Sequence, residues 1–83
     1  MKDIVFSEHS LKQSVERGAS KEEIIYAIRN GEKIPAKHGR IAYRHNFQYN
    51  KKWGKKFYHI KQVIPIIKEE NSIIVVTVYT FYF

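Results

Sequence analysis

The order of apolar and polar residues changes character once along this chain of 83 residues. Up to about residue 31 the apolar residues recur at helical spacing, and after residue 39 they alternate with polar residues. Ser7 can accept an unpaired backbone N–H at the start of a helix, and Gly18 tolerates the left-handed conformation that ends one. These signals predict a first short helix between Ser7 and Gly18.

The second helix has stronger signals. Ser20, followed three residues later by Glu23, forms the pattern of a capping box. The apolar stripe of this helix consists of Ile24, Ile25 and Ile28. Asn30-Gly31 is typical of a helix end, so the second helix is expected between Ser20 and Gly31.

The rest of the chain has the pattern of strands. Residues 41–49 alternate as in a half-buried strand, and 50–54 predict a hairpin connection. A second strand should run to about Lys68, with Pro65 indicating a bulge or an edge position. After a polar turn, residues 73–83 are apolar or β-branched at successive positions, which predicts a central strand covered on both sides for most of its length.

This order of elements predicts an α+β fold, with two N-terminal helices packed on one face of a three- to four-stranded antiparallel sheet. A chain of this length forms a single domain, here residues 1–83, and leaves room only for a shallow site. It has no cysteine, which excludes disulfides, thiolate metal ligands and cysteine nucleophiles. No apolar run approaches the roughly 20 residues that span a bilayer, so no membrane partner is expected.

Positive charge is concentrated in the middle of the chain, which carries a net charge of +7 overall. Residues 33–68 hold ten of the fifteen Lys and Arg residues and none of the eight carboxylates. Aromatic residues are interleaved with them, so we interpret this stretch as a surface that follows phosphates and stacks bases. The candidate RNA-binding residues are Lys37, Lys51, Lys52, Lys55, Lys56, Lys61 and Trp53. The alternative is a solvated basic hairpin whose aromatic residues point inward.

The first helix offers a candidate for acid/base chemistry. Leu11 and Val15 share one side of this helix, whereas His9, Gln13 and Glu16 lie on roughly the opposite side, with Arg17 at its margin. His9 is therefore not expected in the core. An imidazole both takes up and donates a proton near neutrality, so His9 is a candidate acid/base group. The alternative is a surface histidine without a task.

Other chemistries have little support in the sequence. The four histidines contain no helical i, i+4 pair, and both Glu-Glu pairs are explained by a helix start or a turn, so neither a metal nor another cofactor is expected. There is no phosphate-binding glycine loop, no dinucleotide fingerprint and no G-x-S-x-G motif.

Six segments together resemble a bacterial family, the domain of unknown function 4258 family. They are 6–11 (FSEHSL), 16–20 (ERGAS), 22–24 (EEI), 30–32 (NGE), 39–40 (GR) and 76–79 (VTVY). The resemblance spans nearly the whole chain. It implies a fold like that of the barnase, EndoU, colicin and RelE group of small metal-independent ribonucleases. Many relatives have an arginine four residues after the histidine, where this chain has Gln13.

The resemblance implies functional residues. His9 takes the position of the family histidine, Arg40 that of the sheet arginine, and Thr77 and Tyr79 those of polar residues on the last strand. We therefore expect an endoribonuclease, with tRNA among its candidate substrates. In this hypothesis His9 is the acid/base group, Arg40 and Arg44 clamp the phosphate, Thr77 or Tyr79 is the second polar partner, and Arg17 is an auxiliary cation.

The resemblance also implies a biological setting. The last nine residues are similar to the C-terminal ends of secreted polymorphic bacterial toxins, so the domain is expected to act in the cytoplasm, either after delivery into another cell or in the cell that makes it. An acidic immunity or antitoxin protein is the expected inhibitor. The alternative is a non-catalytic module that binds RNA or a protein through the same basic sheet.

Overall fold

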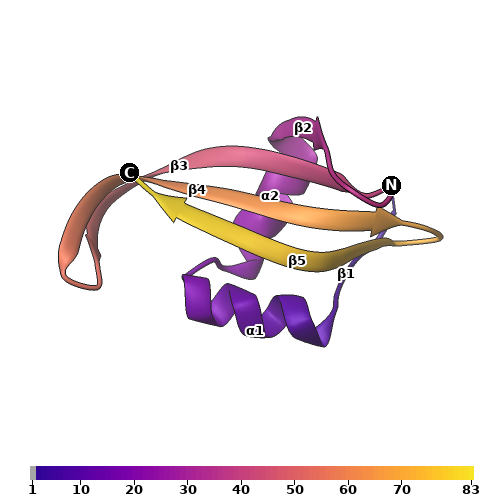
Figure 1. Cartoon of the computed structure of the whole chain (residues 1–83), viewed down its shortest axis with the longest axis horizontal. Helices are drawn as coiled ribbons and strands as arrows, with labels where there is room; N and C mark the ends of the chain where they lie inside the picture. Colours follow the sequence, from indigo (N-terminus) through magenta and orange to yellow (C-terminus); the bar gives the residue numbers. More distant parts are fainter. Residues whose placement is uncertain (1) are drawn as a thin grey trace.

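The computed structural model describes residues 2–83, which form two helices and one five-stranded sheet (Figure 1). In chain order the elements are β1 (Ile4–Phe6), α1 (Glu8–Arg17), α2 (Lys21–Asn30), β2 (Glu32–Pro35), β3 (Ile41–Trp53), β4 (Lys56–Glu69) and β5 (Ile73–Tyr82). Across the sheet the order is β1-β5-β4-β3-β2; β1 is parallel to β5, and all other neighbours are antiparallel.

The predicted α+β class is confirmed, but the expected number and direction of the strands are wrong. The sheet has two additional short strands, β1 and β2, which the sequence did not predict. It is mixed because β1 is parallel to β5. They contain three and four residues. Segments this short carry no measurable alternation, so only their pairing with the long strands reveals them.

Both helices begin and end where the sequence predicts. The Ser7 side chain accepts a hydrogen bond from the Ser10 backbone N–H, and Gly18 ends α1 with a left-handed φ of 76°. Ser20 and Glu23 form the reciprocal capping box of α2. The local capping chemistry therefore sets the boundaries of both helices independently of the sheet.

The core lies between α2 and one face of the sheet, which we call the inner face. Ile24 and Ile28 of α2 are buried there against four residues of the two central strands. These are Val63, Ile67, Val75 and Val78. Figure 1 shows α2 behind the three long strands, with no helix over the side that faces the viewer.

The first helix packs through its small polar residues and not through its apolar side. Ser10 and Ser14 are buried, whereas Val15 is 81% exposed. In Figure 1, α1 lies along the outer edge of β5. Helical spacing correctly separates the two sides of α1, but the hydrophobic side is the one that faces away from the sheet.

Side chains of α1 and of its N-cap residue, Ser7, form hydrogen bonds with the edge of β5 that has no neighbouring strand. β1 pairs with β5 only as far as Val75, so the following residues have no strand neighbour on that edge. The Ser7 hydroxyl donates to the Val76 carbonyl, and Arg17 donates to the Val78 carbonyl. The Gln13 side-chain oxygen accepts from the Val78 N–H at 2.9 Å. These three bonds close an edge that would otherwise be open to pairing with other chains.

The other face of the sheet, which we call the outer face, is uncovered. Strand pairing places Tyr79 beside Ile64 and Phe81 beside Gln62 on this face. Tyr79 is 41% exposed and Phe81 is 48% exposed. The prediction that the last strand is covered on both sides is therefore wrong for its second half.

The hairpin between β3 and β4 is longer than predicted. The strands extend to Trp53 and resume at Lys56, so the turn is shorter than the expected 50–54 connection. Asn50 has a positive φ of 50° where the pairing shifts register, and this irregularity bends the hairpin. Pro65 is buried in β4, the middle strand, so it is not on an edge; a register shift occurs next to it, between Ile66 and Ile67.

Replacing Gln13 with alanine should destabilise the fold by about 1–3 kcal/mol, because the buried Val78 N–H loses its acceptor. Gln13→Arg should also destabilise it, since a guanidinium has no acceptor. Lys12→Ala, an exposed change on the same helix, is the control and should stay within about 0.5 kcal/mol of wild type. Urea unfolding measures all three. Equal stability of Gln13→Ala and Lys12→Ala would contradict this role of Gln13.

Candidate functional site

Three of the predicted catalytic residues, Arg17, Thr77 and Tyr79, lie at the junction between α1 and β5, and His9 lies on the same side of α1. His9, Gln13 and Arg17 recur every four residues, so they form a polar stripe along one side of α1. Gln13 accepts a hydrogen bond from the Thr77 hydroxyl, and the Arg17 guanidinium lies 5.1 Å from the centre of the Tyr79 ring. His9 is exposed one helical turn before Gln13.

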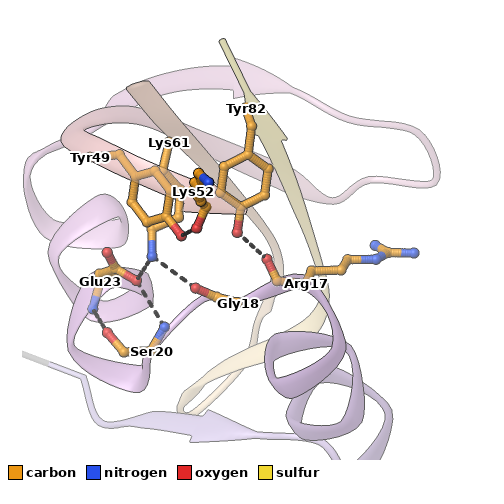
Figure 2. A network of polar contacts seen from close by, with 8 residues as sticks. All are labelled: Arg17, Gly18, Ser20, Glu23, Tyr49, Lys52, Lys61 and Tyr82. Atoms are coloured by element: carbon orange, nitrogen blue, oxygen red, sulfur yellow. Dashed lines mark hydrogen bonds and ion pairs between the residues drawn. The ribbon is translucent and has the colours of Figure 1, made fainter. Parts of the chain in front are cut away.

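Arg17 combines a structural contact with free hydrogen-bonding capacity. One nitrogen of its guanidinium donates to the Val78 carbonyl, which leaves the other donors of a group that has five. Within residues 2–83 no carboxylate forms a salt bridge with it. In Figure 2 the guanidinium points away from the neighbouring polar network. Arg17 can therefore bind an anion at this junction.

Arg40 and Arg44 are not brought to His9. They belong to the β3 side of the sheet, two strands from β5, which is roughly 10 Å before the width of α1 is added. Arg44 forms a salt bridge with Glu32 of β2. With this carboxylate it lines an open hollow of about 460 Å³. The predicted pairing of His9 with these two arginines is therefore not present in the structure.

The lysines of the β3–β4 hairpin form an exposed basic surface, which we call the basic hairpin. Its members are Lys51, Lys52, Lys55 and Lys56, all of them exposed. Figure 1 shows this hairpin extending and curving beyond the rest of the sheet. Lys37 is also exposed, in the loop between β2 and β3. These side chains are available to phosphates.

Lys61 is different from the other predicted RNA-binding lysines. Its side chain lies on the inner face, where the amino group forms a salt bridge with Glu23 at 2.9 Å and donates to the Gly18 carbonyl at 2.8 Å (Figure 2). The residue is only 8% exposed. A buried charge requires such partners, so Lys61 serves the fold and is not available to RNA.

Trp53 fastens the basic hairpin to the end of α1. Its ring stacks on Tyr82 with a centroid distance of 4.9 Å and an angle of 11°. Tyr82 donates to the Arg17 carbonyl at 2.7 Å. A side chain at Gly18 would meet the Trp53 ring at 2.6 Å, so glycine permits this close approach. The basic hairpin and the polar stripe of α1 therefore meet at one end of the molecule, and Trp53 is a packing residue.

The aromatic residues of β3 face inward, as the alternative interpretation of the basic stretch holds. Tyr43 and Phe47 pack against the core, and His45 contacts Tyr26 and Phe47 at centroid distances of 4.9 and 4.7 Å. The most exposed aromatic residues lie elsewhere: at Tyr26 of α2, at Phe57 of β4 and along the end of β5. The exposed rings at the end of β5 occupy alternate positions between residues 79 and 83. The mostly apolar composition of this segment hid that alternation in the sequence.

Neither a metal site nor a membrane helix is found in the described part of the chain. Residues 2–83 contain no cluster of three His, Asp or Glu side chains suited to a metal ion. None of the helices described is long and apolar enough to cross a bilayer. Comparison with protein-family models, curated proteins and solved structures gives no match. The candidate site is therefore defined by its geometry.

The contact between Tyr82 and α1 predicts a pH dependence. Burial, followed by the nearby Tyr49 and Glu23, raises the pKa of Tyr82 from 10.0 to about 12. The neutral phenol is therefore favoured in the folded state, and its stabilising effect is complete below pH 10 and lost as the pH rises through 12. Tyr82→Phe should remove the most alkaline step from a tyrosine absorbance titration. An unchanged titration would contradict the assignment.

Proposed function

We propose that this protein is a metal-independent endoribonuclease whose active site lies at the junction of α1 and β5. The observation that carries the proposal is the polar stripe of α1. Its Gln13 and Arg17 contact Thr77 and Tyr79 of β5, and its exposed histidine, His9, lies one helical turn from Gln13. These are the groups that RNA cleavage without a metal requires.

Each residue has a role in this reaction. His9 takes the proton of the ribose 2′-hydroxyl, and the resulting oxygen forms a bond to phosphorus while the bond to the 5′-oxygen breaks. Arg17 stabilises the negative charge of the pentavalent transition state. The Tyr79 phenol supplies the proton for the leaving 5′-oxygen, and Thr77, whose hydroxyl donates to Gln13, holds α1 beside β5. The products are a 2′,3′-cyclic phosphate and a 5′-hydroxyl.

Arg17 replaces Arg40 and Arg44 as the main cation in this proposal. It contacts β5 directly, whereas Arg44 is paired with Glu32 of β2, the strand at the opposite edge of the sheet. The exposed lysines of the basic hairpin, together with Lys37, would bind phosphates away from the bond that is cleaved. The catalytic and the binding charges thus come from different elements.

The resemblance to the domain of unknown function 4258 family supports the same function and a RelE- and barnase-like fold. In that setting the enzyme acts on RNA in the cytoplasm, in its own cell or after delivery as part of a secreted toxin. The net charge of +7 favours an acidic immunity or antitoxin protein as its inhibitor.

A second candidate function is a non-catalytic RNA-binding module. It is favoured by Gln13, which stands where many members of that family have an arginine. The side-chain oxygen of Gln13 accepts hydrogen bonds from the Thr77 hydroxyl and the Val78 N–H. Residue 13 therefore stabilises the fold and contributes no positive charge. The basic hairpin alone would suffice for binding.

Incubation with total RNA in EDTA tests the proposal. The wild-type protein should produce fragments that end in a cyclic phosphate, and His9→Ala, purified in parallel, should not. Arg17→Ala should slow cleavage about 100- to 1000-fold, because one well-placed electrostatic donor is lost. Arg40→Ala is the matched control and should stay within about tenfold of wild type.

Intact RNA with the wild-type protein, despite measurable binding, would reject the enzyme in favour of the binding module. Equal cleavage by wild type and His9→Ala would also contradict the proposal, because it would indicate a contaminating nuclease or a different catalytic group. A larger loss of cleavage activity in Arg40→Ala than in Arg17→Ala would indicate that Arg40, next to β3, is the main cation at the phosphate.

A further inference from the structure

We propose that the outer face of the sheet is a stacking surface for single-stranded RNA, with the aromatic side chains at the end of β5 as platforms for unpaired bases. This inference rests on the proposed function, since it names the form of RNA that reaches the site. It differs from the prediction made from the sequence, which placed the stacking residues in the basic stretch.

Three aromatic residues lie on one side of the end of the chain. Arg17 covers the ring of the first, Tyr79, so the open platforms are Phe81 and Phe83. Tyr79 and Phe81 are on the outer face by their pairing with β4, and Phe83 continues the alternation through reciprocal backbone bonds with Ile60. Their exposed fractions are 41%, 48% and 62%. Alternate residues of a strand are about 7 Å apart, a spacing that lets neighbouring rings each receive a base.

Their exposure is a feature of the fold and not of a single residue. Tyr82, between Phe81 and Phe83, turns its ring to the inner face and stacks on Trp53. Aromatic rings at the end of β5 therefore alternate between the inner face, where Tyr82 packs, and the solvent-exposed outer face. A contiguous row of exposed rings of this kind marks a binding surface, whereas single exposed apolar residues do not.

The charges around this face favour a polyanion over a second copy of the chain. Glu32, on the edge strand β2, has its charge paired with that of Arg44 of β3. Gln62 and Asn46, next to Phe81, bond to each other and carry no charge. Two copies would bring together net charges of +7 each, whereas RNA supplies the opposite charge. RNA is therefore the occupant that the charges select.

Single strands fit the surface better than duplexes. Stacking on a side chain requires an unpaired base with a free face, which a double helix does not offer. Arg17 lies over Tyr79 at the start of the row, at the same junction as His9. A strand whose bases lie on Phe81 and Phe83 would thus pass its backbone toward the groups proposed to cleave it.

Fluorescence anisotropy with a labelled single-stranded RNA of about 12 nucleotides, free of self-complementarity, tests the inference. The His9→Ala protein is the background, so that binding is measured without cleavage. Phe81→Ala and Phe81→Leu should both weaken binding about 10-fold, because leucine retains apolar surface but offers no ring. Phe81→Tyr should bind as the background does. Val5→Ala, an exposed aliphatic change, is the control and should have no effect.

Three results would overturn the inference. They are unchanged affinity in both Phe81→Ala and Phe81→Leu, full binding by Phe81→Leu alone, and equal affinity for a duplex of the same length. A dimer in sedimentation that Phe81→Ala dissociates without changing RNA affinity would assign the face to self-association. The proposed function is tested separately, because cleavage of total RNA is compared between wild type and His9→Ala, both with Phe81 intact. Failure of the stacking proposal therefore does not imply failure of the enzyme proposal.

Discussion

The hydrogen bond from the Val78 N–H to the Gln13 side chain is the contact on which the arrangement of this protein depends. β5 has a strand neighbour at its outer edge only as far as Val75. Beyond that point a helix side chain satisfies the backbone, so α1 is held at the edge of the sheet and not over a face. This position turns the polar side of α1 toward β5, and it places Arg17 over Tyr79 of the outer face.

Because α2 is the only described helix that covers the sheet, the two faces have different chemistry. The inner face holds the core and a buried lysine, Lys61, with its partner Glu23. The outer face is left with exposed aromatic rings along β5 and uncharged polar residues beside them. Positive charge is found at the basic hairpin and at Arg17, which lies over Tyr79 at the β5 edge of this face, as expected of a surface for a polyanion.

Local chemistry in the sequence predicts much of this fold but little of the site. The ends of both helices follow from Ser7, Gly18 and the capping box, since these signals act within a few residues. The edge strands and the exposed second half of β5 depend on distant neighbours, which no local pattern records. For the same reason helical periodicity places His9 on a polar side but does not reveal that this side faces β5.

The errors at charged positions have a common physical cause. Alternation correctly assigns Arg44 to one face of β3, yet the distance from β3 to α1 depends on strand order, which the sequence leaves open. Lys61 has the same local pattern as the exposed lysines, and only its contact with Glu23 of α2 separates it from them. Residue type and spacing thus identify candidate groups, whereas packing decides which of them meet.

The most direct test of the account is a titration of isotope-labelled His9→Ala protein with single-stranded RNA, followed by NMR. If RNA lies along α1 and the outer face of β5, the largest shift changes will occur at the Gln13 side-chain amide, at Arg17, and at the Tyr79 and Phe81 backbone amides. Inorganic polyphosphate should shift the basic hairpin but not Phe81. Changes confined to residues 51–56 with RNA would contradict the account.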